Sequence, residues 1–367
     1  MTREYLFNNI YIHPAVLSNP ITQQIVKNCP DIPVEVTEKL PIQKVDKGNG
    51  GLAASITHNK RNLWITKQDG KFLHKCPGTP GMVCCNYYVL DLIENCPLEC
   101  TYCFLQGYLN TGPITLHVNL DDLFREVEIL RKNYPDELLR IGTGELSDSL
   151  ALEKLTGITA QLIPFFIEQK NVLLELKTKT NHIEHLKQFR PDGKVVIAWS
   201  VNPDSIIKSE EFNSASLHER LESARQCQSW GYHCAFHFDP MFYFPGWETA
   251  YGEVIDEIFS YVSPENIAWI SLGTFRYFSD LKEIIKERFP KTQIIYGEHY
   301  PNSDGKMRYL RLIRERMYGV VFKRILYYAP ELPVYLCMES AQVWRKVFGW
   351  FPECEKSWSA YFRKELR

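Results

Sequence analysis

The feature that most restricts the fold of this chain is a regular alternation of short apolar runs with amphipathic stretches, which starts near Tyr87. The apolar runs are rich in β-branched and aromatic residues, as buried strands are, and the stretches between them have helical spacing. Strands that alternate with helices pair as parallel neighbours through crossover connections. The predicted strands cover residues 87–93, 138–141, 172–176, 195–201, 234–238 and 267–272.

The helices predicted between these strands complete the repeating unit. They cover residues 120–132, 151–169, 216–230, 249–261 and 279–288. Asn119 is placed to cap the first of them, and Ser279 and Asp280 are capping candidates for the last. Six units are fewer than the eight of a closed barrel. The sequence therefore predicts an α/β fold, an incomplete TIM-like (β/α)6 barrel of parallel strands with N-terminal and C-terminal extensions.

The residues on either side of the repeat predict the extensions. Residues 1–80 contain several prolines and two predicted strands, 63–67 and 71–74, and are expected to form an N-terminal α/β extension or cap. Residues 81–300 are assigned to the partial barrel. Residues 301–367 are expected to form a C-terminal helical extension, with a long helix at 305–328 and one short strand at 334–337.

Composition restricts the class of protein and its compartment. With 45% hydrophobic and 23% charged residues the chain is an ordinary globular one, and its net charge of -2 offers no overall attraction for polyanions. No apolar run approaches the ~20 residues that span a bilayer, so we expect no membrane contact. No secretory signal is visible, so the 11 cysteines favour metal or redox chemistry in a reducing cytoplasm over disulfides.

Three cysteines, Cys96, Cys100 and Cys103, follow the first predicted strand with the spacing Cys-x3-Cys-x2-Cys. Three thiolates can hold three corners of a four-iron cubane and leave the fourth iron open, whereas ferredoxin-type carriers use four cysteines. An open metal position is typical of a catalytic site. The alternative is a zinc site completed by upstream residues, namely His74, Cys76, Cys84 and Cys85. Zinc ligands usually come in pairs, which this loop does not supply.

The cysteine loop resembles that of the radical S-adenosylmethionine (radical SAM) enzymes, and residues 86–335 resemble the spore photoproduct lyase family of these proteins. The landmarks are 96–106 with Leu109, 118–122, Ser147 and Asp148, Thr178, Lys179 and His182, Ser200 and Asn202, 246–248, and 288–292. Each motif is short, and their order and spacing around the cysteines make the combination specific.

The resemblance implies that Cys96, Cys100 and Cys103 ligate a [4Fe-4S] cluster with S-adenosylmethionine on its fourth iron. One electron from an external reductant such as flavodoxin or ferredoxin would cleave the cosubstrate to a 5′-deoxyadenosyl radical, which abstracts hydrogen from the substrate. In the family the substrate is a methylene-bridged thymine dimer. A DNA lesion, or another nucleic-acid or nucleotide substrate, is therefore the first hypothesis. A peptide or small metabolite is the second, and a non-catalytic iron-sulfur or zinc protein is the third.

Several residues are assigned to the cosubstrate. Gly142 and Gly144 would let the backbone approach it closely. Glu145 could accept hydrogen bonds from its ammonium group, in a motif similar to the Gly-Gly-Glu of many radical SAM enzymes. Lys179 would bind its carboxylate as a point charge with three donors. Three further residues are assigned by the resemblance alone: Ser147, Ser200 and Asn202. Outside that context, all of these are ordinary turn or surface residues.

Two departures from the family pattern concern the return of hydrogen to the product. A cysteine that donates hydrogen in the family is replaced by Glu145. Two tyrosines relay the hydrogen atom in the family, and here Tyr102 is kept whereas the second position is Phe104. A carboxylate does not donate a hydrogen atom as a thiol does. Tyr102 and Glu145 remain the predicted catalytic residues, but photoproduct repair by the family's route is not expected.

Two further segments have open interpretations. Cys76, Cys84 and Cys85 could bind a second metal, give a thiol to a product radical, or simply be buried in the core. Residues 306–324 contain seven basic residues and one acidic residue, Glu315. A basic helix of this kind could follow the phosphates of a nucleic acid, or it could be a solvated helix face.

Overall fold

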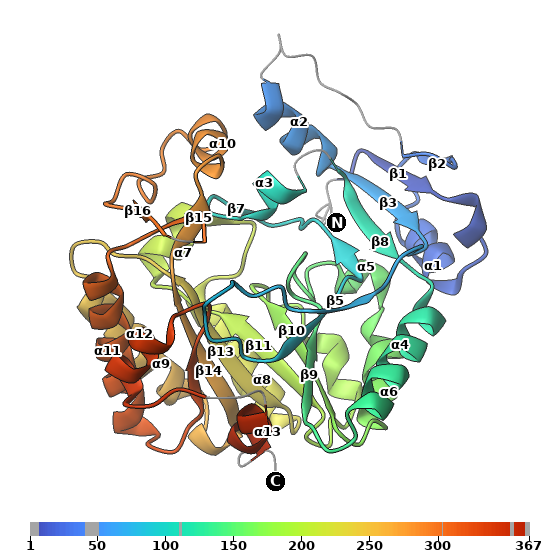
Figure 1. Cartoon of the computed structure of the whole chain (residues 1–367). Helices are drawn as coiled ribbons and strands as arrows, with labels where there is room; N and C mark the ends of the chain where they lie inside the picture. Colours follow the sequence, from blue (N-terminus) through green and yellow to red (C-terminus); the bar gives the residue numbers. More distant parts are fainter. Residues whose placement is uncertain (1–6, 41–50, 110–111, 303, 353–355, 364–367) are drawn as a thin grey trace.

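The computed structural model describes residues 7–40, 51–109, 112–302, 304–352 and 356–363, and its centre is one eight-stranded sheet (Figure 1). In spatial order the strands are β18 (Val334–Leu336), β14 (Ile267–Thr274), β13 (His233–Met241), β11 (Val195–Ser200), β10 (Val172–Thr178), β9 (Leu139–Gly142), β5 (Tyr87–Leu90) and β4 (Leu73–Lys75). From β5 to β18 all neighbours are parallel, and only β4 runs antiparallel. The sheet curls into a half-barrel of the predicted kind.

The number of parallel strands differs from the predicted six. The six predicted strands are all present and pair in chain order, as β5, β9, β10, β11, β13 and β14. A seventh parallel strand, β18, pairs with β14 through registers such as Ile270 with Val334. The sequence had assigned this segment to the C-terminal extension, because three residues are too few to show a pattern of their own. The barrel therefore includes part of that extension.

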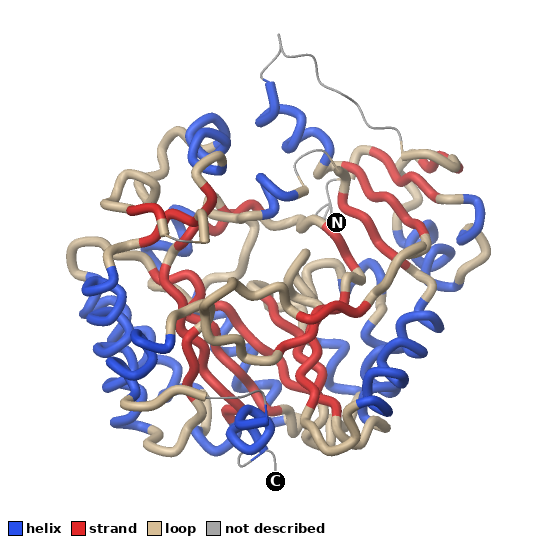
Figure 2. Tube along the Cα trace, viewed as in Figure 1, coloured by secondary structure: helices blue, strands red, loops and turns tan. Residues whose placement is uncertain are grey.

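Helices cover the outer face of the curled sheet, where Figure 2 shows them in blue around the red strands. They are α4 (Leu120–Asn133), α5 (Glu153–Thr156), α6 (Thr159–Ile167), α7 (Asp204–Glu210), α8 (Leu217–Ser229), α9 (Trp247–Tyr261), α11 (Arg311–Tyr328) and α12 (Ala341–Phe348). The last helix, α13 (Lys356–Arg363), lies on the inner side of the sheet, where Phe362 packs against Trp269 and Arg140. The helix predicted at 151–169 is divided, because Gly157 is left-handed with a φ of 58° and ends α5. No helix among the described residues has both the length and the apolar character that crossing a bilayer requires.

The caps agree only in part with those predicted. Ser216 caps α8 through a capping box with Glu219, which satisfies backbone groups at both residues. Asn119 precedes α4 without capping it, because its side chain is engaged elsewhere. Its Oδ1 accepts from the backbone N–H of Gln68 at 2.8 Å, and its Nδ2 donates to Asp122 at 2.8 Å. Asn119 thus occupies the predicted N-cap position of α4, but a contact distant in sequence takes the place of the capping hydrogen bond.

A second sheet forms the N-terminal unit. Its strands, in spatial order, are β2 (Val34–Val36), β1 (Asn9–Ile12), β3 (Asn62–Thr66), β8 (Ile114–His117) and β6 (Ile93–Glu94). The associated helices are η1 (Pro14–Val16), α1 (Pro20–Asn28) and α2 (Gly51–Asn59). Because β6 and β8 lie on either side of the cysteine loop in sequence, the segment between them is carried on this sheet rather than on the barrel. The N-terminal sheet thus extends well past residue 80.

After the sixth predicted strand, the helix predicted at 279–288 is present as α10 (Leu281–Arg288), and around it the chain forms a small antiparallel sheet that the sequence did not predict. The sheet consists of β15 (Arg276–Phe278), β17 (Lys306–Arg308) and β16 (Tyr300–Pro301), and α10 lies between β15 and β16 in the chain. The predicted helix at 305–328 therefore starts only at Arg311. The remaining short elements are α3 (Leu105–Tyr108), β7 (Glu99–Cys100), β12 (Glu211–Phe212), η2 (Glu184–Gln188) and η3 (Pro264–Asn266).

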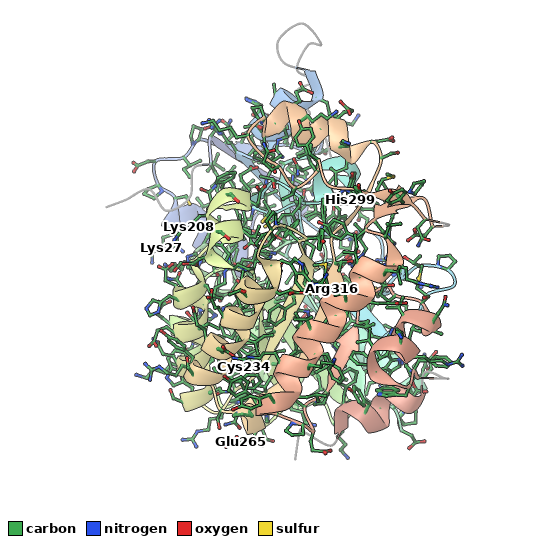
Figure 3. All side chains as sticks on the ribbon, turned by 90° about the vertical axis from the view of Figure 1, so that its left-hand side faces the viewer. Lys27, Lys208, Cys234, Glu265, His299 and Arg316 are labelled. Atoms are coloured by element: carbon green, nitrogen blue, oxygen red, sulfur yellow. The ribbon has the colours of Figure 1, made fainter. Side chains whose placement is uncertain are left out.

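The basic residues of 306–324 are mostly paired. Their ion pairs are Arg308 with Asp304 at 2.5 Å, Arg311 with Glu315 at 3.3 Å, Arg314 with Glu339 at 2.8 Å, Arg316 with Glu248 at 2.6 Å and Arg324 with Asp256 at 2.5 Å. Figure 3 shows Arg316 on α11. Arg308 and Arg314 are also buried. Carboxylates therefore already neutralise most of the charge that a nucleic acid would need.

The loop between β4 and β5, residues 76–86, spans the open side of the half-barrel. The N–H of Val83 donates to the carbonyl of Glu339, beyond β18, at 2.8 Å. Trp358 of α13 donates to the carbonyl of Cys84 at 2.7 Å. These contacts connect the loop that precedes β5, the first parallel strand, to the residues that follow β18, the last parallel strand. Figure 1 shows the loop running across the front of the sheet. We call residues 76–86 the thiol loop, for its cysteines.

Candidate active site

The three motif cysteines lie on a loop at the carboxyl end of the barrel. Cys96 and Cys100 are buried, Cys103 is half-buried, and none of them is in a disulfide. Lys179, which directly follows β10, has its Nζ 5.8 Å from the centre of the Tyr102 ring. The loop thus faces the strand ends at which parallel barrels carry their chemistry. We call residues 95–106 the cluster loop.

Gln106 holds the backbone of the cluster loop in one conformation. Its Nε2 is in hydrogen-bond range of three loop carbonyls, those of Cys100 at 3.4 Å, Thr101 at 2.9 Å and Cys103 at 3.2 Å. Its Oε1 accepts from Arg288, which also donates to Glu99 Oε2 at 2.6 Å. One amide side chain therefore gives three carbonyls of the irregular loop a shared side-chain partner. The cysteines are positioned by contacts that do not involve a metal.

The buried carboxylate of Glu211 holds the cluster loop in place through Tyr102. It forms an ion pair with Arg220 at 2.6 Å, and both side chains are wholly buried. It also accepts from Asn202 at 3.0 Å and from the hydroxyl of Tyr102. Burial alone would raise the pKa of Glu211, but the charges of Arg220 and Lys179 hold this pKa below its ordinary value. A charged network thus connects Tyr102 of the loop to two strand ends.

A second acidic residue, Glu210, pairs with the loop backbone. The N–H of Thr101 donates to the Glu210 carbonyl at 2.9 Å, and the Thr101 hydroxyl donates to its carboxylate at 2.5 Å. Thr292 donates to the same carboxylate at 2.6 Å. Beside this contact, β7 of the loop pairs with β12. The sequence did not identify Glu210 or Glu211, because their partners in the loop, Thr101 and Tyr102, are 109 residues away and no local pattern marks them.

The environment of the thiols favours their protonated form. Burial, together with the charge of the neighbouring Asp148, raises the pKa of Cys96 to about 12. Burial also raises the pKa of Cys100. A bound metal would therefore displace protons from both sulfurs, as metals do when they ligate thiols.

The thiols are not arranged for a single metal ion. In the part of the chain that the structure describes, no three His, Cys, Asp or Glu side chains are grouped closely enough to hold one ion. A cubane cluster is different, because each thiolate binds its own iron and the sulfurs lie farther apart. Three unpaired thiols on one fixed loop fit that demand and leave one iron without a protein ligand. The choice between a cluster and the zinc alternatives, including the site with His74, Cys76, Cys84 and Cys85, remains a prediction.

Ser147 is the predicted cosubstrate residue with a free group. Its side chain is buried, and its hydroxyl has no hydrogen-bond partner among the described residues. Buried polar atoms are nearly always satisfied, so an orphaned hydroxyl at a strand end indicates a missing ligand or water. The next residue, Asp148, accepts from the Lys179 N–H at 2.7 Å and from Thr178 at 2.7 Å. This carboxylate joins the ends of β9 and β10 and holds Ser147 beside Lys179.

The other predicted cosubstrate residues are placed differently. Asn202 is buried, and both ends of its amide are engaged, by Glu211 and by the Tyr251 hydroxyl at 2.9 Å. Ser200 is buried, and its carbonyl accepts from Arg220 at 2.9 Å. The structure thus brings Asn202 and Ser200 to the same buried arginine network. Their contact with a cosubstrate remains a prediction.

The two glycines are enclosed by protein side chains. A Cβ at Gly142 would lie 1.6 Å from the Tyr87 hydroxyl, and one at Gly144 would lie 2.8 Å from Cβ of Lys177. Their close neighbours in the structure are therefore side chains, and approach to a ligand remains a prediction. Glu145 is half-buried, and its charge adds to burial in raising the pKa of the Cys76 thiol.

A polar network inside the barrel was not recognised from the sequence. Glu175 accepts from His237 at 2.7 Å and from Trp269 at 3.0 Å, and Ser271 contacts the other nitrogen of His237 at 2.6 Å. Burial would raise the pKa of Glu175, but His237 and Arg140 hold it well below its ordinary value. Each of these polar residues interrupts an otherwise apolar strand, which is a signal that could have identified them.

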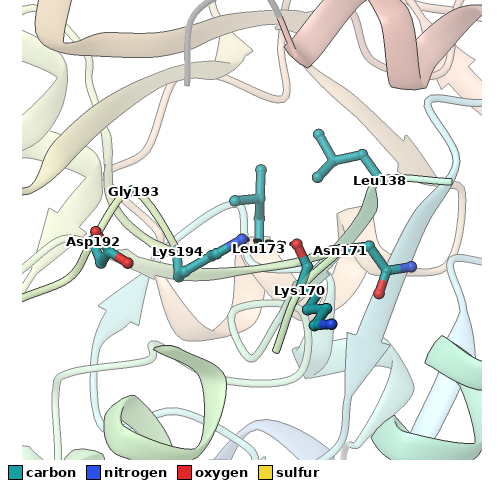
Figure 4. Close-up of a pocket in the computed structure, with 7 residues that line it drawn as sticks. All are labelled: Leu138, Lys170, Asn171, Leu173, Asp192, Gly193 and Lys194. Carbon is teal, nitrogen blue, oxygen red and sulfur yellow. Dashed lines mark hydrogen bonds between the residues drawn. The ribbon is translucent and has the colours of Figure 1, made fainter. Parts of the chain in front are cut away.

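A cavity of about 210 Å³ lies at the opposite end of the strands (Figure 4). Its lining includes Leu138, Asn171 and Lys194, which directly precede β9, β10 and β11. The amino-terminal ends of barrel strands serve stability rather than chemistry. This cavity is therefore separate from the candidate active site.

Comparison with known proteins gives a consistent result. A family model described as spore photoproduct lyase matches residues 5–314. The spore photoproduct lyase of Geobacillus sp. is 26% identical over 294 residues, which are 79% of this chain and 84% of that protein. A solved spore photoproduct lyase complexed with dinucleoside spore photoproduct has a TM-score of 0.79 at 23% identity and covers 91% of this chain and 99% of its own. A variant with bound AdoMet and dinucleoside spore photoproduct has a TM-score of 0.78, with the same identity and coverage.

Proposed function

Because this chain belongs to the spore photoproduct lyase family, we propose that it is a radical SAM enzyme with a [4Fe-4S] cluster on Cys96, Cys100 and Cys103. The observation that carries the proposal is the cluster loop: three unpaired thiols, fixed by Gln106 and the Glu211 network, at the carboxyl end of a half-barrel. When bound, the cluster and S-adenosylmethionine would supply a radical that abstracts hydrogen from the substrate.

The residues around the cluster loop would bind and orient the cosubstrate. Lys179 offers a cation beside Tyr102, and Ser147 offers a buried hydroxyl that is free to bond. Glu145, half-buried at the end of β9, would accept hydrogen bonds from an ammonium group. The Glu211 carboxylate holds Tyr102 in place through its hydroxyl. Large apolar side chains pack around this network and exclude water, which would otherwise quench a radical.

The substrate class that we propose is a methylene-bridged thymine dimer or a related nucleotide lesion. The support is that family members have been solved with dinucleoside spore photoproduct bound. We do not assign nucleic-acid contact to α11, because Arg314, Arg316 and Arg324 are already paired with carboxylates. An external one-electron reductant such as flavodoxin or ferredoxin completes the system. A reducing cytoplasm, in which the thiols stay free, is the proposed location.

Anaerobic reconstitution with iron and sulfide tests the proposal. The reduced protein should release 5′-deoxyadenosine from S-adenosylmethionine, and Cys100→Ala should abolish the release because the cluster loses a ligand. The matched control is Cys29→Ala, which removes a buried thiol from the end of α1, outside the site. An iron-sulfur carrier or a zinc protein would release none. Release that survives in Cys100→Ala would contradict the ligand assignment.

A further inference from the structure

Alternate residues of each barrel strand point into the half-barrel, and contacts between strands identify which ones. Glu175 on β10 accepts from His237 on β13 at 2.7 Å, so both side chains face the interior. Two residues further along the same strands, and therefore on the same face, are Lys177 and Asp239. Only β11 lies between β10 and β13 (Figure 1). Lys177 and Asp239 thus border one space, a layer nearer to the carboxyl ends of the strands.

This layer lies between the Glu175 network and the cluster loop. Glu175 is only 2% exposed, whereas Lys177 is half-buried and the side chain of Asp239 is 22% exposed. Two residues beyond Lys177 is Lys179, whose Nζ lies 5.8 Å from the centre of the Tyr102 ring. The barrel interior is therefore closed at the level of Glu175 and open at the level of Lys177, on the side of the cluster loop.

Two glycines make room for the charged side chains of this layer. A Cβ at Gly144 would lie 2.8 Å from Cβ of Lys177, and one at Gly273 would lie 2.5 Å from Oδ1 of Asp239. Both side chains therefore lie directly against backbone, and a larger residue at either glycine would displace them. The layer is shaped around Lys177 and Asp239.

The two side chains differ in what they contact. Arg276 holds Asp239, with Nη1 donating to Oδ1 at 2.9 Å and Nη2 donating to Oδ2 at 3.2 Å. Each carboxylate oxygen has two lone pairs, so Asp239 can accept a further hydrogen bond. The ammonium group of Lys177 makes no hydrogen bond or ion pair with any residue that the structure describes, although its backbone bonds to Ser149. The layer thus offers an unused donor and an unused acceptor to the same space.

A donor and an acceptor that border one space fit a ligand with a carbonyl and an N–H group on a single edge. Thymine and uracil have such an edge, because their two ring carbonyls flank the N3–H group. Cytosine presents an amino group and an unprotonated ring nitrogen there, which reverses the pattern. A trans peptide unit carries its carbonyl and its N–H on opposite sides, so a peptide main chain does not match both groups at once.

We propose that Lys177 and Asp239 form a substrate subsite that binds the imide edge of a pyrimidine-2,4-dione ring, such as thymine. Lys177 donates to a ring carbonyl, and Asp239, held by Arg276, accepts from the N3–H group. This inference rests on the proposed function and deepens it, because it assigns the residues that select thymine over cytosine in a dimeric lesion. A site built to hydrogen-bond a group rejects analogues that lack it, since its own polar groups then stay unpaired.

Binding without turnover tests the role of Lys177. The reconstituted protein is mixed with S-adenosylmethionine and dinucleoside spore photoproduct, without reductant, and the dissociation constant is measured by equilibrium dialysis. Lys177→Met keeps the length of the side chain but removes the donor. It should weaken binding by about tenfold or more, as the loss of a hydrogen bond from a charged group does. The matched control is Lys170→Met, at an exposed position just before the opposite end of β10, which should bind as the wild type does.

A modified photoproduct tests the role of Asp239 without a change in the protein. Methylation of N3 on both rings removes the N–H groups that the carboxylate would accept from. The methylated photoproduct should bind the wild type about tenfold or more weakly than the unmethylated one. Lys177→Met should show the same loss on methylation, because this variant keeps the acceptor.

The outcomes separate the subsite from the proposed function. Equal affinity of the wild type and Lys177→Met for the photoproduct would overturn the subsite, and so would equal affinity of the wild type for the methylated and unmethylated photoproducts. A wild type that releases 5′-deoxyadenosine when reduced but binds no photoproduct would also overturn it and leave the radical SAM assignment standing. Absence of 5′-deoxyadenosine from the reduced wild type would instead contradict the proposed function itself.

Discussion

The cluster loop (95–106) and the thiol loop (76–86) both carry three cysteines at the same end of the barrel, yet they are held differently. The cluster loop is fixed by charged and amide side chains, chiefly Gln106, Arg288 and the buried Glu211. The thiol loop is held mainly by backbone contacts, such as Cys76 with Tyr87 at 2.8 Å and Met82 with Thr79 at 3.0 Å.

The difference matches what each loop would have to do. Ligands of a rigid cubane must stand in fixed positions, and a network of buried side chains supplies that precision. The thiol loop holds none of the proposed cluster ligands, and the few backbone hydrogen bonds that hold it give it a lower local stability. The predictions below test this contrast, from the largest expected effect to the smallest.

Removing the central carboxylate should have the largest effect. Glu211→Ala leaves Arg220 as an uncompensated buried charge, so the free energy of unfolding should fall by about 3–5 kcal/mol. Urea unfolding of the protein as purified measures this change. The control, Glu222→Ala, breaks an exposed pair with Arg225 on helix α8. It should change the free energy of unfolding far less, because water already solvates that pair. Equal losses in the two variants would refute the special role of the buried network.

Gln106→Leu should loosen the cluster loop without unfolding the barrel. The leucine removes the donor to three loop carbonyls and the acceptor of Arg288, at a cost of about 1–3 kcal/mol. The reconstituted variant should lose iron to a chelator faster than the wild type does. Gln161→Leu, at an exposed position on α6, should hold its iron normally. Equal retention of iron in both variants would mean that Gln106 does not position the ligands.

Gly81→Ala should affect only the thiol loop. Gly81 has a φ of +78°, and no atom lies within 4 Å of the position of an added Cβ, so the cost is conformational. A loss of about 1 kcal/mol is expected, with iron content unchanged. The control, Gly252→Ala within α9, also meets no atom within 4 Å but should stabilise the protein slightly, because alanine is the better helix former. A loss of iron in Gly81→Ala would show that the two loops are coupled.

The smallest expected effect is the pH dependence of stability that Asp91 produces, at the end of the β4–β5 hairpin. Burial raises the pKa of Asp91 from 3.8 to about 6, against the opposing effect of His74. The folded state thus binds this proton more tightly than the unfolded state, so stability falls as pH rises from about 4 to about 6. Asp91→Asn should remove this dependence and stabilise the protein at pH 7. Because the carboxyl is partly exposed and water screens its charge, we expect a gain of about 1 kcal/mol rather than the full value of the pKa shift. A constant difference between the two proteins from pH 4 to pH 7 would contradict the shift.

The sequence predicted what is local. The spacing of Cys96, Cys100 and Cys103 and the apolar runs of the barrel strands are both properties of short segments. From these segments the sequence predicted the cluster loop and the chain-order pairing of the six strands. The sequence did not predict that the three-residue strand β18 belongs to the barrel, because its pairing with β14 depends on the curvature of the whole sheet.

What the sequence could not predict is what holds the site together. Gln106 meets Arg288 across 182 residues, and Tyr102 meets Glu211 across 109. The thiol loop meets the segment after the last strand, through Val83 and the carbonyl of Glu339, only because it crosses the half-barrel. Such contacts follow from topology, and in the sequence they are visible only as polar residues at unexplained positions. The pairing of the basic residues on α11 is a further example, since the carboxylates of Glu248 and Asp256 come from α9.

Electron paramagnetic resonance of the reduced, reconstituted protein tests the central claim most directly. The claim is that three thiolates leave one iron of a cubane free for S-adenosylmethionine. We expect about four irons per chain and a cluster spectrum that changes when S-adenosylmethionine is added. A spectrum that is indifferent to S-adenosylmethionine, or zinc in place of iron on these cysteines, would contradict the account.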